Sequence, residues 1–278
     1  MTHDGRSSTA ELLDRFGYTS PGFGERYDLG RPSPPARLVD ELLDLVGTPR
    51  VERVVDLGSG TGLSSAVWVG VGGEVIGIEP SDEMRRVAEK RLHGTTARFV
   101  AAVAEDTGLA DACADIVSAS NSVTWFDPAR AYPEIGRILR PRGVFATYFH
   151  GWPPKVDPVV DEVSEAHVDR VDALLGREGG GARTDVANAH ARLEAAIAAS
   201  GWFEDIVVRA RPDVQRYDVA RLLAFVRSSG SATRLAHAGL DDDALGITAL
   251  EEVLRVVVGS GTVDVELSYT VVTARRSG

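Results

Sequence analysis

The glycine-rich stretch VVDLGSGTG, Val54 to Gly62, constrains this chain more than any other feature of its sequence. Apolar β-forming residues at 51–57 lead into glycines at alternate positions from Gly58, and LSSAVWV behind them is typical of a short helix. Glycine allows a sharp reversal and a close approach of backbone to ligand because it has no Cβ. The following helix N-terminus offers free N–H groups and partial positive charge. The stretch therefore predicts a strand, a ligand-facing turn and a helix.

Two acidic residues accompany the glycine turn and narrow the ligand that it can hold. Asp56 stands two positions before Gly58, and Glu79 ends the next apolar run, EVIGIE. The dinucleotide fingerprint is G-x-G-x-x-G, and the closer glycine spacing here disfavours an NAD-dependent oxidoreductase. An acid at the turn suits a cationic group better than a diphosphate, and an acid after the second strand suits ribose hydroxyls. The pattern predicts a nucleoside ligand that carries positive charge.

These motifs resemble those of the class I S-adenosylmethionine-dependent methyltransferases. The first family motif is matched by VVDLGSGTG, the second by VIGIEPSDEM, and the segment before the fifth strand by LRPRGVFATYF. In the small-molecule branch similar to trans-aconitate methyltransferase, His-Trp-Phe-Asp follows the fourth strand, and this chain keeps Trp-Phe-Asp at 125–127 behind Thr124. The resemblance covers residues 27–150 by motif and 186–274 by topology only.

The succession of apolar runs and helical patterns predicts an α/β fold whose parallel sheet is covered by helices on both faces. The resemblance implies a Rossmann-like sheet of seven strands in which the last strand alone is antiparallel. The expected strands are 53–57, 74–79, 97–101, 114–119, 144–149, 202–209 and 262–274. The expected helices are 36–46, 63–69, 82–92, 127–140, 159–175, 186–200, 218–227 and 241–258.

This order divides the chain into four expected parts. Residues 1–35 are an N-terminal lid segment, 36–150 the S-adenosylmethionine-binding core, 151–186 a helical insertion, and 187–278 the completion of the core, with a second helical insertion at about 211–261. Both insertions begin at carboxyl ends of parallel strands, which is the ligand face of an open α/β sheet. We expect them to form a lid over the acceptor, with scaffold decoration or a dimer interface as alternatives.

Aromatic residues are concentrated in the otherwise polar N-terminal segment. Phe16, Tyr18, Phe23 and Tyr27 fall within a short stretch. Such a density is unusual for a disordered tail. The N-terminal segment is interpreted either as a lid that closes over the ligand or as a frayed tail.

The resemblance implies S-adenosylmethionine as the cofactor, with a separate protein partner for each of its parts. The turn backbone and Asp56 suit the methionine tail with its ammonium group, and the Glu79 carboxylate suits the two ribose hydroxyls. Arg31 matches an arginine that lies near the cofactor's carboxylate in similar enzymes, or is a solvated residue before a proline turn. Met84 either packs against adenine or belongs to the core.

The expected adenine contacts depart from the family pattern. Related enzymes carry an aspartate after the third strand that meets the adenine amino group, and Val103 stands at that position here. Adenine contacts are therefore expected from the backbone near Ala104 or from Glu105. The complete set of expected cofactor-binding residues is Tyr27, Arg31, Asp56, Gly58, Ser59, Gly60, Gly62, Glu79, Pro80, Met84, Ala104, Glu105 and Asn121.

The implied reaction is an in-line displacement from a positively charged sulfur, in which alignment of the reacting atoms can supply much of the rate. A general base is optional and depends on the acceptor. His150, at the end of the fifth strand, is the best placed histidine for that role, and Asn121 and Ser122 are expected close to the sulfonium methyl. No motif with metal-ligand spacing occurs, so no metal is expected. The residues expected to contact the acceptor are Tyr18, Trp125, Phe126 and Trp152.

Composition narrows the expected partners. The net charge of −11 argues against nucleic acid and anionic membranes, and no apolar run is long enough to cross a bilayer. Cys113 is the single cysteine, which excludes an internal disulfide framework. We predict a cytoplasmic enzyme, as a monomer or homo-oligomer, that methylates a small-molecule acceptor such as a secondary metabolite. The alternative is a protein of the same fold that binds S-adenosylmethionine without methyl transfer, such as a repurposed cyclase.

Overall fold

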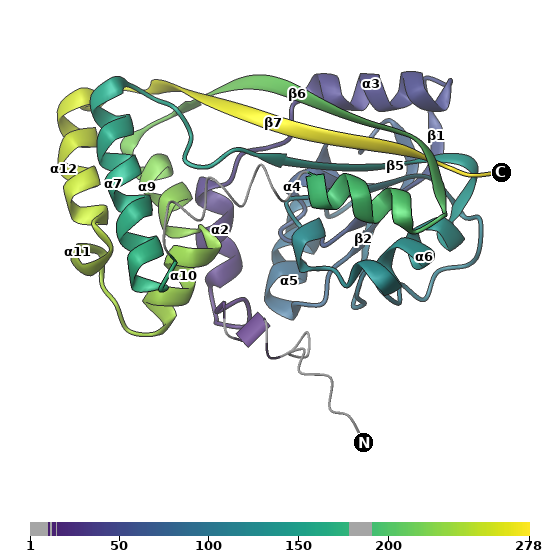
Figure 1. Ribbon diagram of the computed structural model, residues 1–278, viewed down its shortest axis with the longest axis horizontal. Helices are drawn as coiled ribbons and strands as arrows, with labels where there is room; N and C mark the ends of the chain where they lie inside the picture. The colour runs from purple at the N-terminus through teal and green to yellow at the C-terminus, as the bar shows by residue number, and fades with distance from the viewer. Residues whose placement is uncertain (1–10, 12, 15, 178–190) are drawn as a thin grey trace.

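The computed structural model describes residues 11, 13–14, 16–177 and 191–278. Its centre is a seven-stranded sheet in the order β3-β2-β1-β4-β5-β7-β6 (Figure 1). The strands are β1 (Val51–Leu57), β2 (Gly72–Ile78), β3 (Ala97–Val100), β4 (Ala114–Ser120), β5 (Leu139–His150), β6 (Phe203–Tyr217) and β7 (Val263–Arg276). β7 is antiparallel to β5 and β6, and the other pairs are parallel. The predicted Rossmann-like sheet with an antiparallel last strand is confirmed.

The core helices are α3 (Ala36–Val46), α4 (Leu63–Ala66), α5 (Asp82–Arg91), the 3-10 turn η1 (Val123–Trp125) and α6 (Pro128–Ile138), and residues 191–199 are also helical. They cover both faces of the sheet because successive strand residues point to opposite sides. Val54 of β1 belongs to the apolar cluster that contains Leu42 of α3, whereas Val55 belongs to the cluster of Ile135 in α6. The helix predicted at 186–200 lies partly outside the described residues.

Local signals in the sequence set the ends of these helices. The Ser81 side chain accepts a hydrogen bond from the Met84 N–H at the start of α5, and Asp127 caps α6 in the same way. Such caps satisfy N–H groups that have no partner within the helix. α3 ends at Gly47, whose φ of 83° is a left-handed conformation that glycine adopts readily. These three helices lie within two residues of their predicted bounds.

A second group of helices lies at the far end of β6 and β7 (Figure 1). It consists of α7 (Pro158–Leu174), α9 (Val219–Arg227), α10 (Gly230–His237), α11 (Asp242–Leu245) and α12 (Ile247–Val257), which we call the cap. One apolar cluster extends from Tyr148 on the sheet to Phe225 and Leu254 in the cap. The cap and the sheet therefore share a core. Among the described residues, no helix is long and apolar enough to span a membrane.

The sixth strand is longer than predicted. It was expected at 202–209 but continues to Tyr217, because it pairs with β7 as far as the Tyr217–Val263 pair. Pro212 does not interrupt it, since β6 is an edge strand, where a missing N–H is tolerated. The second excursion from the sheet consequently begins at residue 218 rather than at about 211.

The last predicted helix is divided. Helical spacing suggested one helix over 241–258, whereas α11 and α12 meet at Gly246. Gly246 has a φ of 76°, a left-handed conformation that ends one helix and redirects the chain into the next.

Helix α2 (Phe23–Gly30) lies between the cap and the core (Figure 1). Before it, the Ser81 hydroxyl donates a hydrogen bond of 2.7 Å to the Tyr18 carbonyl, which ties the segment to α5. At its end, Gly30 approaches the cap so closely that a Cβ would lie 2.1 Å from the Phe225 nitrogen. The described part of the N-terminal segment is thus packed against both neighbours.

Candidate active site

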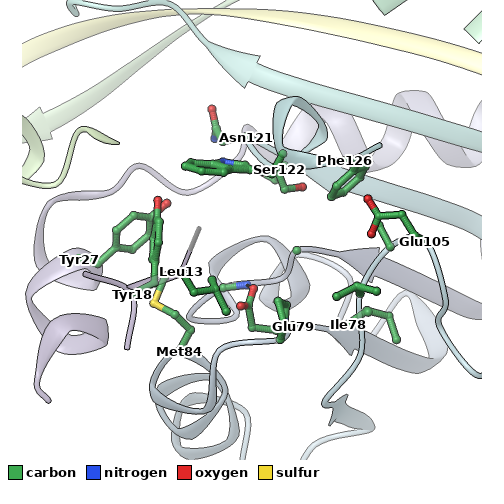
Figure 2. A pocket seen from close by; sticks show the side chains of 17 residues that line it. Leu13, Tyr18, Tyr27, Ile78, Glu79, Met84, Glu105, Asn121, Ser122 and Phe126 are labelled. Atoms are coloured by element: carbon green, nitrogen blue, oxygen red, sulfur yellow. Dashed lines mark hydrogen bonds between the residues drawn. The ribbon is translucent and has the colours of Figure 1, made fainter. Parts of the chain in front are cut away.

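A pocket opens beside the glycine turn, at the carboxyl ends of β1, β2 and β4, and we call it the glycine-turn pocket. Figure 2 shows Tyr18 and Tyr27 on one side of it, with Phe126 and Glu105 on the opposite side. The predicted residues that line it are Tyr18, Tyr27, Gly58, Gly60, Glu79, Pro80, Met84, Ala104, Glu105, Asn121, Trp125 and Phe126. The topology therefore brings together most of the residues that the motifs singled out.

Glu79 is the buried acid of this pocket. One carboxylate oxygen accepts a hydrogen bond from the Gly60 N–H over 3.0 Å, and the other accepts from the Ser81 N–H over 2.9 Å. Burial raises the pKa of the Glu79 carboxyl above its ordinary value. A carboxylate has about four lone-pair sites, so Glu79 keeps acceptor capacity toward the pocket. It can accept two neighbouring hydroxyls from one ligand.

The glycine turn leaves backbone exposed to the pocket. Gly58 has a φ of 63°, and a Cβ there would lie 2.5 Å from Cβ of Ser122. The Ser122 hydroxyl donates to the Leu57 carbonyl over 2.6 Å, which holds the end of β4 against the turn. Any side chain at position 58 would therefore collide with a neighbour that is itself fixed.

Asn121 follows β4 and lies in an uncommon backbone conformation. Its φ is 53°, a left-handed value that asparagine tolerates better than most residues. Its N–H donates to the Tyr148 carbonyl over 2.9 Å, and its side-chain oxygen accepts from the His150 N–H over 3.3 Å. These two hydrogen bonds link the ends of β4 and β5. Left-handed backbone conformations of residues other than glycine are often found at functional sites.

The far end of the pocket is formed by the loop after β3 and by Phe126. Val103, Ala104 and Glu105 line it, and one Glu105 oxygen accepts from the Asp127 N–H over 2.7 Å. Met84 is 3% exposed and also lines the pocket, so it takes part in both the core and the lining. This end offers apolar surface and backbone groups, as expected for contact with a flat base.

Asp56 does not line the pocket, contrary to the expectation that it faces the cofactor's ammonium group. It has no exposed surface, and its oxygens accept hydrogen bonds from Ser65 (2.7 Å), Ser118 (2.9 Å) and Ser64 (3.3 Å). Burial raises the pKa of Asp56 to about 6, and the serine hydroxyls oppose that shift. Asp56 therefore ties β1, α4 and β4 together beneath the turn.

Ser59 and Gly62 also lie outside the lining of the pocket. Ser59 is 5% exposed, and its hydroxyl has no hydrogen-bond partner in the described part of the chain. Gly62 precedes α4 and packs on α5, where a Cβ would lie 3.1 Å from Cβ of Ala88. Both residues shape the turn, and their direct contact with a ligand stays a prediction.

Three further predicted residues lie in a second cavity. Arg31, His150 and Trp152 line a space of about 200 Å³ between the end of β5, α7 and the start of α10, which we call the His150 cavity. His150 is 8% exposed, and burial together with the nearby Arg31 charge lowers the pKa of its imidazole to about 4. His150 is therefore neutral at pH 7.

The two cavities are neighbours. The Arg31 guanidinium carbon lies 4.5 Å from the ring centroid of Tyr27, which lines the glycine-turn pocket. On the other side, Asn121 of that pocket accepts the hydrogen bond from the His150 N–H. The predicted acceptor residues are thus divided: Tyr18, Trp125 and Phe126 line one space, and Trp152 lines the other.

Some lining residues were not predicted as site residues from the sequence. Leu13, Ile78 and Ser120 line the glycine-turn pocket. Ser120 precedes Asn121 and could have been found from its position at the end of the fourth strand. Ser122, which the sequence places close to the sulfonium methyl, also lines the pocket. Leu13 carried no signal, because one leucine in a helical stretch gives no sign of what it covers. In the described part of the chain, no group of three or more His, Cys, Asp or Glu residues could hold a metal ion.

Comparison with known proteins shows which enzymes this chain resembles. A family model for the methyltransferase domain matches residues 55–147. An uncharacterized methyltransferase of Mycobacterium tuberculosis is 34% identical over 151 residues, which cover 52% of this chain and 60% of that protein. A malonyl-[acyl-carrier protein] O-methyltransferase of Enterobacter lignolyticus is 34% identical over 132 residues, 47% of this chain and 50% of that protein. The matched region spans about half to three fifths of these curated relatives.

Solved structures extend the likeness beyond the matched domain. A proposed type II methyltransferase from Anaeromyxobacter dehalogenans superposes with a TM-score of 0.66 at 25% identity, over 88% of this chain and 97% of that one. A phosphoethanolamine N-methyltransferase of Haemonchus contortus, solved with S-adenosyl-L-methionine, shares the fold with a TM-score of 0.55 at 16% identity, over 100% of this chain and 62% of that one. Residues 55–147 therefore match a methyltransferase domain, and the chain has the fold of class I S-adenosylmethionine-dependent methyltransferases.

Proposed function

We propose that this protein binds S-adenosylmethionine in the glycine-turn pocket and transfers its methyl group to a small-molecule acceptor, such as a secondary metabolite. The observation that carries the proposal is the Glu79 carboxylate, which is buried beside the Gly60 backbone and keeps acceptor capacity toward the pocket. A ribose offers two adjacent hydroxyls to such a group. The match of residues 55–147 to the methyltransferase domain supports the same ligand.

The residues present fit the parts of this cofactor. Glu79 would hold the ribose, and Met84 with the backbone at Val103 and Ala104 would enclose the adenine. Gly58 and Gly60 line the pocket without side chains, and the methionine end would lie against their backbone. The bound cofactor supplies a methyl group on a positively charged sulfur.

The pocket must open to admit a ligand of this size. Its volume is about 130 Å³, whereas pockets for ligands of comparable size are roughly 300–1,000 Å³. Tyr18 and Trp125 contact each other edge to face at 5.9 Å and form a wall contributed by the N-terminal segment and η1. We infer that this wall moves aside on binding and then covers the cofactor, which excludes water from the reacting groups.

The chain's contribution to the rate is chiefly alignment. Asn121 is held by backbone hydrogen bonds at the junction of the two cavities and is our candidate for a residue beside the reacting methyl. His150 remains our candidate for a base, since it is neutral at pH 7. Its use depends on the acceptor, because an acidic or electron-rich acceptor needs alignment alone.

The test of the proposal is binding of S-adenosylhomocysteine measured by titration calorimetry. Glu79→Ala should weaken binding by about 1.5–3 kcal/mol, roughly ten- to a hundredfold, because charge-assisted hydrogen bonds to ribose are lost. The matched control is Glu74→Ala in β2, the strand that Glu79 follows, whose carboxylate pairs with Arg53 and Arg98. It should leave the affinity unchanged.

Two results would contradict the proposed function. Equal affinity of wild type and Glu79→Ala for S-adenosylhomocysteine would contradict the role of Glu79 in binding the ribose. Tighter binding of NAD than of S-adenosylhomocysteine would contradict S-adenosylmethionine as the cofactor. Transfer is checked separately, by the mass gain of one methyl group on an acceptor incubated with the protein and S-adenosylmethionine. Cofactor binding without any such gain across a broad acceptor panel would favour a protein that binds but does not transfer.

A further inference from the structure

We propose that the His150 cavity binds an acceptor that carries both a carboxylate and a hydroxyl group, with the carboxylate on Arg31 and the hydroxyl on Nε2 of His150. The inference rests on the proposed function for the role of this ligand as acceptor. Its chemical class is derived from two polar groups in the cavity whose bonding capacity the described chain leaves unmet.

Residues from both excursions line this cavity. His150 and Trp152 enter it from the end of β5, Val171 from α7, and Ser229 from the start of α10. Its volume is about 200 Å³. A ligand about the size of one substituted ring fits such a space.

His150 lines this cavity, and its unbonded ring nitrogen is an acceptor and not a donor. Its Nδ1 lies 3.1 Å from the Gly151 carbonyl oxygen, which only accepts hydrogen bonds, so Nδ1 carries the hydrogen of the neutral ring. Nε2 then holds a lone pair, and this buried atom has no partner in the described part of the chain. The ring packs against Phe225 and Tyr269, with centroids 5.1 and 6.0 Å away, and is held in place.

A buried acceptor without a partner is rare in folded proteins and indicates a missing donor. Burial and the Arg31 charge keep the pKa of His150 at about 4, so Nε2 stays unprotonated at neutral pH. The ligand must therefore bring an O–H or N–H group to this atom.

The positively charged Arg31 guanidinium, in turn, requires a negatively charged partner. One terminal nitrogen donates to the Ser228 carbonyl over 2.6 Å, and the Nε atom is buried without a partner. No carboxylate of the described residues forms an ion pair with this guanidinium. Arginine binds carboxylates through paired N–H donors in a fixed plane. A carboxylate on the ligand satisfies both the charge and the free donor.

The other polar residues of the cavity favour a hydroxyl over an ammonium as the donor group. Asp172 also lines the cavity, but its carboxylate already pairs with Arg177 at 3.4 Å. His167 is engaged through Nδ1 with the Leu245 carbonyl at 2.7 Å. An ammonium would thus enter beside the Arg31 charge without a free counterion, whereas a hydroxyl carries no charge.

The experiment uses the full chain and simple probes. The three isomers of hydroxybenzoate carry both groups, benzoate lacks the hydroxyl, and phenol lacks the carboxylate. Calorimetry on the wild type should show at least one hydroxybenzoate binding ten-fold or more tightly than benzoate and phenol. Because this comparison involves no substitution, it does not depend on any variant folding. Equal affinity of all the probes, or tighter binding of an aromatic amino acid such as phenylglycine, would overturn the proposal.

Two variants assign the groups to residues. Arg31→Gln should weaken hydroxybenzoate and benzoate roughly ten- to a hundredfold and leave phenol unchanged. His150→Phe keeps an aromatic ring but removes Nε2, so it should weaken hydroxybenzoate and phenol several-fold and leave benzoate unchanged. The same loss for all three probes in either variant would show a structural effect and contradict the assignment.

A last comparison separates the acceptor from the cofactor as the source of the carboxylate. S-adenosylhomocysteine carries an amino-acid carboxylate, and 5′-methylthioadenosine is the same nucleoside thioether without it. Under the proposal, Arg31→Gln leaves the ratio of their affinities unchanged. If the variant weakens S-adenosylhomocysteine alone and spares hydroxybenzoate, Arg31 serves the cofactor and the proposal fails. Failure of the proposed function is distinct, since it would appear in Glu79→Ala and not in these probes.

Discussion

At the scale of single residues, the Asp56 carboxylate stabilises the site from beneath. Three serine hydroxyls from α4 and β4 donate to it, and it has no exposed surface. Burial raises its pKa from 3.8 to about 6 because the charged form loses its hydration. Between pH 3.8 and about 6, the protonated form of Asp56 is therefore favoured in the folded chain but not in the unfolded chain.

This shift predicts how stability depends on pH. Between pH 3.8 and about 6, the folded state holds a proton that the unfolded state releases, so this contribution is present below pH 3.8 and is lost as pH rises through 6. Two pKa units correspond to about 3 kcal/mol. Asp56→Asn removes the titration, so the stability of the variant relative to wild type should rise by about that amount from pH 4 to pH 7. Urea unfolding at each pH measures the free energy of unfolding of both proteins. A difference between variant and wild type that does not change with pH would contradict the prediction.

Gly58 gives a second prediction at this scale. Gly58→Ala should place a Cβ 2.5 Å from Ser122 in a left-handed backbone conformation, and so reduce stability by about 2 kcal/mol or more. Gly94 is the matched control, since it has a φ of 78° with nothing within 4 Å of a Cβ, and Gly94→Ala should cost only about 1 kcal/mol. Thermal unfolding and S-adenosylhomocysteine titration check both, and equal losses would show that the contact with Ser122 is unimportant.

At the scale of elements, the segment before α2 joins the core to the pocket wall. The Tyr18 ring contacts Phe23 at 5.0 Å and Trp125 at 5.9 Å, while its carbonyl accepts the Ser81 hydroxyl. The contacts that close the pocket are thus made by the ring, and the contact that anchors the segment is made by the backbone. Substitution of the side chain can separate closure from anchoring.

Tyr18→Ala should therefore speed the release of S-adenosylhomocysteine. Loss of aromatic contacts worth about 0.5–1.5 kcal/mol each predicts a dissociation rate about three- to tenfold higher, with little change in the association rate. Tyr18→Phe keeps the ring and should behave like wild type. Stopped-flow fluorescence of the bound complex measures both rates. Unchanged dissociation in Tyr18→Ala would mean that the segment does not cover the ligand.

At the scale of the whole molecule, the cap and the sheet are expected to unfold together. The apolar cluster that includes Tyr148 of β5 continues through Phe225 to Leu250 in α12. Elements that share one core lose its packing together, so a cap substitution should reach the sheet. The long pairing of β6 with β7, up to Tyr217–Val263, connects the two regions through the backbone as well.

Leu250→Ala tests this cooperativity. Leu250 is 1% exposed, so the substitution should reduce stability by about 2–5 kcal/mol and lower the midpoint of one common transition. Val256 lies in the same helix but is 85% exposed, and Val256→Ala should change stability by less than about 0.5 kcal/mol. Calorimetry gives the transitions directly. A separate early transition in Leu250→Ala would show that the cap is an independent unit.

The sequence by itself determined the features that depend on neighbouring residues. The bounds of α3 followed from helical spacing that ends at Gly47, and the start of α5 followed from Ser81 as its cap. The placement of Gly58 and Glu79 beside one pocket followed from two consecutive strand ends, because parallel strands bring their carboxyl ends to one edge. Each inference needed only local physical chemistry or a topological rule.

Tertiary structure alone decided the rest. Asp56 points beneath the turn because serines from two other elements surround it, and no local pattern distinguishes that direction from one toward the ligand. Arg31 and His150 meet in one cavity although more than a hundred residues separate them in the chain, since α2 and β5 are both packed against the cap. A cavity forms where such distant surfaces fail to fill space, and that depends on packing of the whole molecule.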